Sequence, residues 1–196
     1  MEKAAYLEGQ LTILKALESL ILRYRDAASD AGNTLSADSL THLLSDAPHT
    51  LQDALQMQRI IHFTMWCAGN YHNTLGRFDQ YMMPYLQADL DAGRLTEESA
   101  LELLEEFFLT FNLDSDLYPG MQQGDNGQSM VLGGMTPEGK DGFNLLSRLC
   151  LQASLELIER ERQLLRSGSS EDASAQQRTA EALRRQDDCR TALGPV

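Results

Sequence analysis

The stretch Gly76-Arg77-Phe78-Asp79-Gln80-Tyr81 decides the fold, together with a second string downstream, GGMTPEGKD from Gly133 to Asp141. Neither string follows the three- to four-residue period of a helix or the alternation of a strand. Each joins glycine or proline, which favour special backbone conformations, to polar side chains at a point where an apolar run ends. Such strings indicate backbone passages that serve one particular structure or site.

Helices dominate the structure expected around these strings. Apolar residues at helical spacing predict helices over residues 3–28 and 51–67, from the first string to about 92, from 96 to about 112 and from 143 to about 166, with a short one between 33 and 46. Thr50 and Asp141 are expected to cap the helices that follow them. Only residues 128–132, short, apolar and flanked by glycine, predict a strand. We therefore expect a mostly α fold with one or two short strands, whose edges need partners that the sequence does not contain.

Composition excludes several classes of function. The 196 residues carry a formal net charge of −13, which argues against nucleic-acid binding because phosphate recognition needs clustered Lys and Arg. No apolar run is long enough to predict a membrane span, and the first residues are acidic where a signal peptide would be basic and then apolar. The three cysteines are odd in number and far apart, which favours a reducing, cytoplasmic location. The four histidines show no ligand spacing on a common helix face, so no metal site is predicted.

The charge is unevenly distributed along the chain. Residues 160–196 hold seven Arg and six acidic residues, a net charge of +1, so residues 1–159 carry −14. Ser, Gln and Ala fill the gaps between the arginines. This change of composition predicts one domain over 1–158, followed by an Arg/Ser/Gln-rich tail over 159–196 that is helical or disordered.

Further motifs follow the first string in a fixed order. They are Pro84-Tyr85, then GDNGQS at 124–129 with Leu132-Gly133-Gly134, then Asp141-Gly142-Phe143-Asn144-Leu145-Leu146. In this order they resemble the first part of the pyruvate formate-lyase-like glycyl radical enzymes, from about residue 5 to about residue 158. The resemblance implies an incomplete fragment of the ten-stranded α/β barrel of that family.

The resemblance also implies a type of chemistry. In the family a backbone glycine stores an unpaired electron and takes a hydrogen from a cysteine, and the cysteinyl radical attacks the substrate. The implied reaction is radical cleavage or elimination at a C–C, C–N, C–O or C–S bond of a small polar metabolite without oxygen, by a lyase or a formate acetyltransferase-like enzyme. An S-adenosylmethionine and iron–sulfur activating enzyme installs the radical, so the chain itself is expected to bind no cofactor.

Five residues are substrate-pocket candidates through the resemblance: Asp79, Tyr71, Arg77, Gln128 and Asn144. Asp79 would orient a polar or cationic substrate group; alternatively, it is an acid in the first turn of a helix, stabilised by the helix dipole. Arg77 could bind an anionic group or pair with an acid such as Asp79. A tyrosine in the position of Tyr71 is more often a packed loop aromatic. Gln128 and Asn144 could line the same cavity, but polar side chains at a strand edge usually satisfy backbone groups.

No catalytic residue is predicted. Cys67 and Cys150 are expected to be small buried apolar residues, and Cys189 lies in an acidic, polar context unlike the family's reactive loop. No glycine matches the family's R-V-(A/S)-G-Y string. The chain alone is therefore expected to be inactive. Two interpretations remain open: part of an enzyme that a second polypeptide completes for its small-molecule substrate, or a non-catalytic helical interaction protein.

Overall fold

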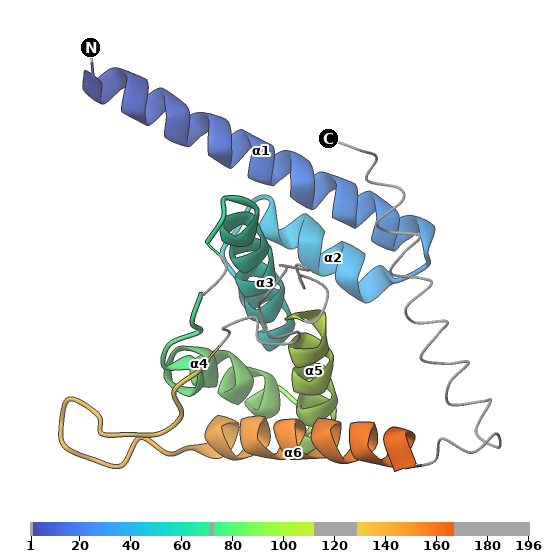
Figure 1. The fold of residues 1–196 in the computed structure, drawn as a ribbon. Helices are drawn as coiled ribbons and strands as arrows, with labels where there is room; N and C mark the ends of the chain where they lie inside the picture. The colour runs from blue at the N-terminus through green and yellow to red at the C-terminus, as the bar shows by residue number, and fades with distance from the viewer. Residues whose placement is uncertain (1, 71–72, 112–128, 167–196) are drawn as a thin grey trace. The chain divides into compact units, whose positions relative to one another are not determined.

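The computed structural model describes residues 2–70, 73–111 and 129–166, and side chains within these ranges from residue 3 to residue 160. Figure 1 shows the six helices of this part of the chain: α1 (Glu2–Asp30), α2 (Thr34–Leu43), α3 (Leu51–Cys67), α4 (Phe78–Asp91), α5 (Glu97–Thr110) and α6 (Leu145–Arg166). The chain divides into two compact units, residues 1–154 and 155–196. The predicted mostly helical fold class is confirmed; the predictions for 113–127 and for the tail from 167 onward lie outside the described residues.

Hydrogen bonds explain where α3 and α6 begin. Thr50 caps α3 as predicted, because its side chain accepts from the amide of Asp53 while Asp53 accepts from the amide of Thr50. The prediction that Asp141 caps the last helix is wrong. Asp141 accepts from the Phe143 amide in the preceding turn, and α6 instead begins after Asn144.

Asn144 and Ser147 cap α6 reciprocally. The Oδ1 of Asn144 accepts from the Ser147 amide at 3.0 Å, and the Ser147 Oγ accepts from the Asn144 amide at 2.9 Å. Each side chain thus satisfies an amide that the helix leaves without a partner. The start of α6 is therefore fixed two residues later than the sequence predicts.

The predicted strand over 128–132 is an extended segment without a sheet where the structure describes it. Met130 makes one isolated parallel bridge with Gly76, and Met135 makes one antiparallel bridge with Asp141. A turn lies between these last two residues, in which the Gly139 amide donates to the Thr136 carbonyl at 2.9 Å. A β-ladder needs a second strand. Among the described residues, this segment pairs only with the loop before α4, so no sheet forms there.

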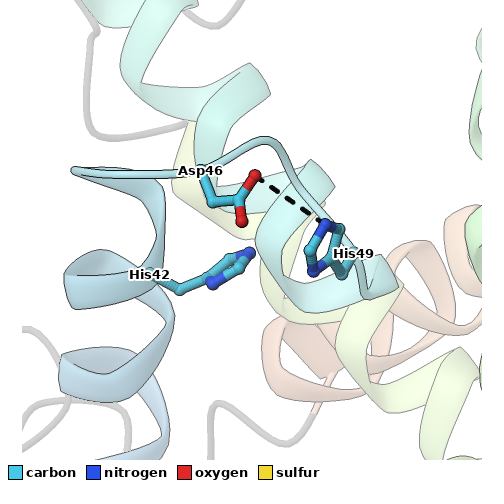
Figure 2. A group of neighbouring side chains, drawn as sticks. All are labelled: His42, Asp46 and His49. Atoms are coloured by element: carbon cyan, nitrogen blue, oxygen red, sulfur yellow. Dashed lines mark ion pairs between the residues drawn. The ribbon is translucent and has the colours of Figure 1, made fainter.

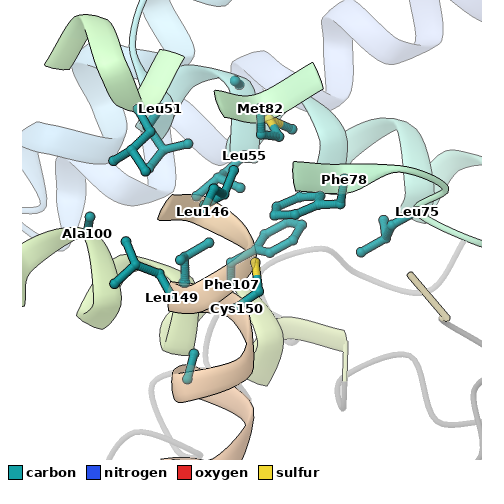
Figure 3. Close-up of a cluster of buried hydrophobic side chains, with 14 of the residues drawn as sticks. Leu51, Leu55, Leu75, Phe78, Met82, Ala100, Phe107, Leu146, Leu149 and Cys150 are labelled. Carbon is teal, nitrogen blue, oxygen red and sulfur yellow. The ribbon is translucent and has the colours of Figure 1, made fainter. Parts of the chain in front are cut away.

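The main core joins helices α3 to α6. Figure 3 shows Phe78 of α4 and Phe107 of α5 lying face to face, with ring centroids 5.6 Å apart and planes inclined by 14°. Buried side chains of α3, α4, α5 and α6 surround this pair: Leu51, Ala54, Leu55, Met82, Leu86, Ala100, Leu104, Leu146, Leu149, Cys150 and Ala153. An offset aromatic pair adds to the burial of its own apolar area, so the stack holds α4 and α5 together.

A second, smaller cluster joins α1 and α2 to α3 through Ile21, Leu40 and Ile60. Beyond it, the apolar stripe of α1 is uncovered in the described chain, and Ile13 is 59% exposed. The sequence also predicts that the apolar C-terminal half of α3 is buried. This prediction is wrong for Ile61 and Met65, each 42% exposed. None of the described helices combines the length and apolar character that crossing a membrane requires.

Asp89, near the end of α4, ties that helix to the beginning of α3. Its side chain is 2% exposed, and its Oδ2 accepts from the amide of Leu51, the first residue of α3, at 2.7 Å. Its Oδ1 accepts from Nε of Arg94 at 2.7 Å. The carboxylate therefore satisfies a free amide at the positive end of α3 from a residue 38 positions away.

Replacing Asp89 by Ala is expected to lower the free energy of unfolding by about 2–3 kcal/mol, because hydrogen bonds to a buried charged group are lost. Asp91→Asn is the control: Asp91 is exposed on the same helix, and its substitution should stay within about 0.5 kcal/mol of the wild type. Urea unfolding followed by circular dichroism measures both. Equal stability of the two variants would show that Asp89 does not hold α3 to α4.

Candidate functional site

The first string of the sequence forms the entrance to α4. Gly76 has a φ of +60°, in the left-handed region that glycine adopts without strain. Phe78 follows as the first helical residue and is completely buried in the aromatic stack. The glycine thus turns the chain, and the phenylalanine anchors the start of the helix in the core.

The segment after residue 128 runs beside this entrance. The Leu75 amide donates to the Ser129 carbonyl at 2.9 Å, and the Val131 amide donates to the Gly76 carbonyl at 2.7 Å. The Thr74 hydroxyl also donates to the Ser129 carbonyl, at 2.7 Å. These bonds bring Gly133 and Gly134 over the first turn of α4.

Asp79 links three segments from one buried position. Its side chain is 0% exposed, and its Oδ2 accepts from the Gly133 amide and from the Ser147 hydroxyl, each at 2.5 Å. Its backbone carbonyl accepts from the side-chain amide of Asn144 at 3.0 Å. The first turn of α4, the glycine loop and the start of α6 therefore meet at one carboxylate, which the amino end of α4 also stabilises.

The other oxygen of this carboxylate differs. Oδ1 of Asp79 is buried and has no hydrogen-bond partner among the residues that the structure describes. An unpaired buried oxygen is costly, and native proteins retain few of them. Asp79 therefore has one oxygen committed to the fold and one available to a further donor.

Arg77 and Gln80 bind the loop on either side of Asp79. Nη2 of Arg77 donates to the Gly133 carbonyl at 2.9 Å, and Nε2 of Gln80 donates to the Gly142 carbonyl at 2.7 Å. The sequence suggested an acid as the structural partner of Arg77; the hydrogen bond observed goes to a backbone carbonyl instead. Both side chains thus supply hydrogen bonds to loop carbonyls that are not paired in a sheet.

Gly142 lies where the loop passes closest to itself. Its amide donates to the Gly134 carbonyl at 2.6 Å. A Cβ added there would lie 3.0 Å from the Gly134 oxygen and 3.1 Å from both Nη2 of Arg77 and the Gly133 oxygen. Glycine is therefore required at this position for steric reasons, and Gly133 and Gly134 have positive φ angles of 69° and 79°.

The cysteines of the described chain show no reactive environment near Asp79. Burial, with a smaller contribution from the charge of Asp79, raises the pKa of Cys150 to about 12, so its thiol stays protonated and unreactive. The predicted burial of Cys150 is confirmed, whereas the same prediction for Cys67 is wrong because that residue is exposed. Cys189 lies outside the described residues. Burial likewise raises the pKa of Tyr81 to about 12, and its hydroxyl donates to the Leu75 carbonyl.

Three of the five pocket candidates come together. Asp79, Arg77 and Asn144 all bind within the junction of α4, the glycine loop and α6. Tyr71 and Gln128 lie outside the described residues. A substrate pocket formed by the five residues stays a prediction.

Sequence reasoning missed a second group of polar side chains. His42, Asp46 and His49 each offer a ligand atom, and these atoms all lie within 4.8 Å of one another (Figure 2). His42 lies in the last turn of α2, Asp46 follows it by four residues, and His49 follows Asp46 by three. The search for a common helix face overlooked them because the helix ends between the first and the second.

The comparison with protein families decides the relationship of the chain. The pyruvate formate lyase-like family matches residues 2–162. The chain belongs to this family of glycyl radical enzymes.

Named relatives agree with this family assignment. The chain is 25% identical over 172 residues to the 4-hydroxyphenylacetate decarboxylase glycyl radical subunit of Clostridioides difficile, covering 79% of this chain and 19% of that protein. It is 40% identical over 87 residues to the isethionate sulfite-lyase of Nitratidesulfovibrio vulgaris, covering 41% of this chain and 10% of the relative. A solved structure described for 1,2-propanediol dehydration in Roseburia inulinivorans aligns with a TM-score of 0.60 at 27% identity, over 75% of this chain and 19% of that chain.

A glycyl radical enzyme structure from Archaeoglobus fulgidus shares the fold, with a TM-score of 0.62 at 22% identity over 71% of this chain and 20% of that chain. The chain thus spans about a fifth of the length of these solved structures and of the decarboxylase subunit.

Asp79→Ala and Asp79→Asn separate the two oxygens of this carboxylate. The alanine variant removes both bonds to Oδ2, so we expect the free energy of unfolding to fall by at least about 3 kcal/mol. Asparagine keeps one oxygen for these donors but removes the charge and buries an unpaired NH2 group, so its stability should fall by about 1–2 kcal/mol, less than for alanine. Chemical denaturation measures both, and an alanine variant as stable as the wild type would contradict the three-segment link.

Gly142→Ala is expected to lower the free energy of unfolding by about 1–3 kcal/mol, because two carbonyl oxygens and Arg77 would have to move. Gly9→Ala is the matched control. Gly9 lies within α1 with nothing within 4 Å of an added Cβ, so alanine there should raise stability by about 0.5–1 kcal/mol. Thermal unfolding of both variants tests the difference in sign.

Proposed function

We propose that this chain forms the helical N-terminal part of a glycyl radical enzyme. The complete enzyme would cleave or eliminate at a C–C, C–N, C–O or C–S bond of a small polar metabolite in the absence of oxygen. The observation that carries the proposal is the family match over residues 2–162. Relatives named as a decarboxylase, a sulfite-lyase and a dehydratase support this range of bonds.

Within this enzyme, the junction around Asp79 contributes one wall of the substrate pocket. The unpaired Oδ1 of Asp79 supports a role in receiving a polar or cationic substrate group, because a buried carboxylate oxygen gains most from an added donor. Arg77 and Asn144 hold the loop and α6 in place around this carboxylate. Tyr71 and Gln128 complete the proposed set of pocket residues.

In this proposal the reactive cysteine, the radical glycine and the barrel strands lie outside residues 1–196, for example on a second polypeptide, and an S-adenosylmethionine and iron–sulfur activating enzyme installs the radical. The residues of this chain do not fit the radical site: no glycine of the sequence matches the family string. In the described residues, glycines such as Gly76 and Gly133 have left-handed conformations that serve turns. No radical step is therefore assigned to this chain.

The uncovered side of α1 supports a partner of this kind. Five large apolar residues on its first half are between 49% and 65% exposed: Tyr6, Leu7, Leu11, Ile13 and Leu14. Contiguous apolar surface of this sort usually marks a contact with another protein surface. A cytoplasmic location is part of the proposal, supported by the buried free thiol of Cys150.

Electron paramagnetic resonance tests the division of labour. The purified chain, incubated without oxygen with S-adenosylmethionine, a reductant and an activating enzyme of the family, should give no glycyl radical doublet. A full-length family enzyme in the same mixture is the positive control and should give one. A doublet that arises from this polypeptide would contradict the assignment of the radical site to another chain.

Sequencing the flanking DNA in all three frames beyond the codon for Ile158 tests the proposal itself. We expect a reading frame that encodes the remaining strands, a cysteine loop and an R-V-(A/S)-G-Y string. Co-expression of that product should then yield a complex that the activating enzyme can convert to the radical form.

A helical interaction protein without catalysis is the second candidate, and the exposed face of α1 favours it equally. Unrelated neighbouring genes, together with a compact monomer in size-exclusion chromatography, would decide for this candidate.

A further inference from the structure

We propose that His42, Asp46 and His49 form a binding site for a divalent transition-metal ion, and that zinc is the ion that this set of ligands selects. The three side chains converge beside the end of α2, as Figure 2 shows. Two imidazoles and one carboxylate are a common ligand set for zinc in proteins. Magnesium and calcium prefer sites built from oxygen atoms alone, so the two histidines disfavour both.

The distances are close to those around a bound ion. The ligand atoms of the three residues lie within 4.8 Å of one another, and Nε2 of His49 lies 4.0 Å from Oδ1 of Asp46. Tetrahedral zinc with bonds of about 2.0–2.2 Å sets neighbouring ligand atoms about 3.3–3.6 Å apart. Side-chain rotations that shift the ligand atoms by about 1 Å would therefore close the site around the ion.

A simple ion pair between Asp46 and His49 explains this geometry less well. A charge-assisted hydrogen bond between nitrogen and oxygen closes to about 2.7–2.9 Å. The observed 4.0 Å is longer than such a bond and nearer to the distance between two ligands of one metal. The ring centroids of His42 and His49 lie 4.6 Å apart. A third potential metal ligand is therefore present, whereas an ion pair needs only two groups.

The ring of His42 is already oriented toward the other two side chains. Its Nε2 lies 2.9 Å from the carbonyl oxygen of Ala47, a hydrogen bond that holds the ring in place. Figure 2 shows the ring nitrogen farther from the helix directed toward Asp46 and His49, so an ion bound there would replace this hydrogen bond.

The backbone that carries the ligands is held from both ends. At the end of α2, the His42 carbonyl accepts from the amides of Ser45 and Asp46 at 3.1 and 3.0 Å. At the start of α3, Oδ2 of Asp53 accepts from the His49 amide at 3.2 Å. A preformed backbone lowers the entropy lost when a ligand orders the site.

A bound ion would join the end of α2 to the entrance of α3. Three protein ligands leave one position of a tetrahedral ion for water or for a donor from another molecule. The site is separate from the junction at Asp79, so it does not depend on the proposed radical function.

Calorimetric titration of the full chain, without a histidine tag and freed of metal by a chelator that is then removed, tests the site with zinc chloride. One saturable equivalent is expected. His42→Ala and His49→Ala should each weaken binding by more than the about 10-fold typical of losing an outer partner of a metal site. Asp91→Asn is the control for Asp46→Asn, because it makes the same charge change at a distant position on α4. The Asp91 variant should bind zinc as the wild type does, whereas Asp46→Asn should bind zinc more weakly.

Thermal unfolding provides a second readout. Zinc should raise the Tm of the wild type and of Asp91→Asn, because an ion that binds only the folded state stabilises it, and should leave that of His49→Ala unchanged. His49 is exposed, so its variant decides the question if His42→Ala fails to fold. Equal zinc binding by all variants would indicate attraction to the acidic surface in general and would overturn the proposal. So would a wild type that binds zinc no better than magnesium.

Discussion

The buried carboxylate of Asp79 is the constraint on which the rest of the structure depends. One of its oxygens accepts from donors 54 and 68 residues further along the chain, so three distant segments must meet at the first turn of α4. A charged group in such a place is stable only where its hydrogen bonds replace water. The amide of Gly133 and the hydroxyl of Ser147 do so for one oxygen, and the other oxygen has no partner within residues 2–70, 73–111 and 129–160. The same residue thus organises the fold and leaves an acceptor for a further donor.

Helix α4 carries a buried carboxylate near each end, and the two have different structural roles. Asp79 at its start fixes the glycine loop and the beginning of α6, while Asp89 near its end satisfies the first amide of α3. Directly before Asp79, Phe78 stacks on Phe107 of α5. Charge and apolar packing therefore act on the same helix. The polar bonds set which segments approach it, and burial of the aromatic pair stabilises the result.

Apolar side chains are unevenly covered along the chain. Helices α3 to α6 enclose a continuous core, whereas α1 keeps large apolar residues such as Leu11 and Ile13 exposed along its first half. The match extends over about a fifth of the solved family structures. The histidine group between α2 and α3 stands apart from this relationship, because none of its residues contributes to the junction at Asp79.

The sequence by itself determined the helices, the Thr50 cap and the family, because helical periodicity, capping residues and the strings around Gly76 and Gly142 are local signals. It also identified Asp79, Arg77 and Asn144 as the residues worth attention. Only the tertiary structure decided which donors each of them meets, that Asn144 and not Asp141 begins α6, and that Cys67 and Met65 are exposed. It alone brought His42, Asp46 and His49 together across the end of a helix. Hydrogen bonds and burial depend on segments that fold next to each other from far apart in the chain, and no local pattern records that proximity.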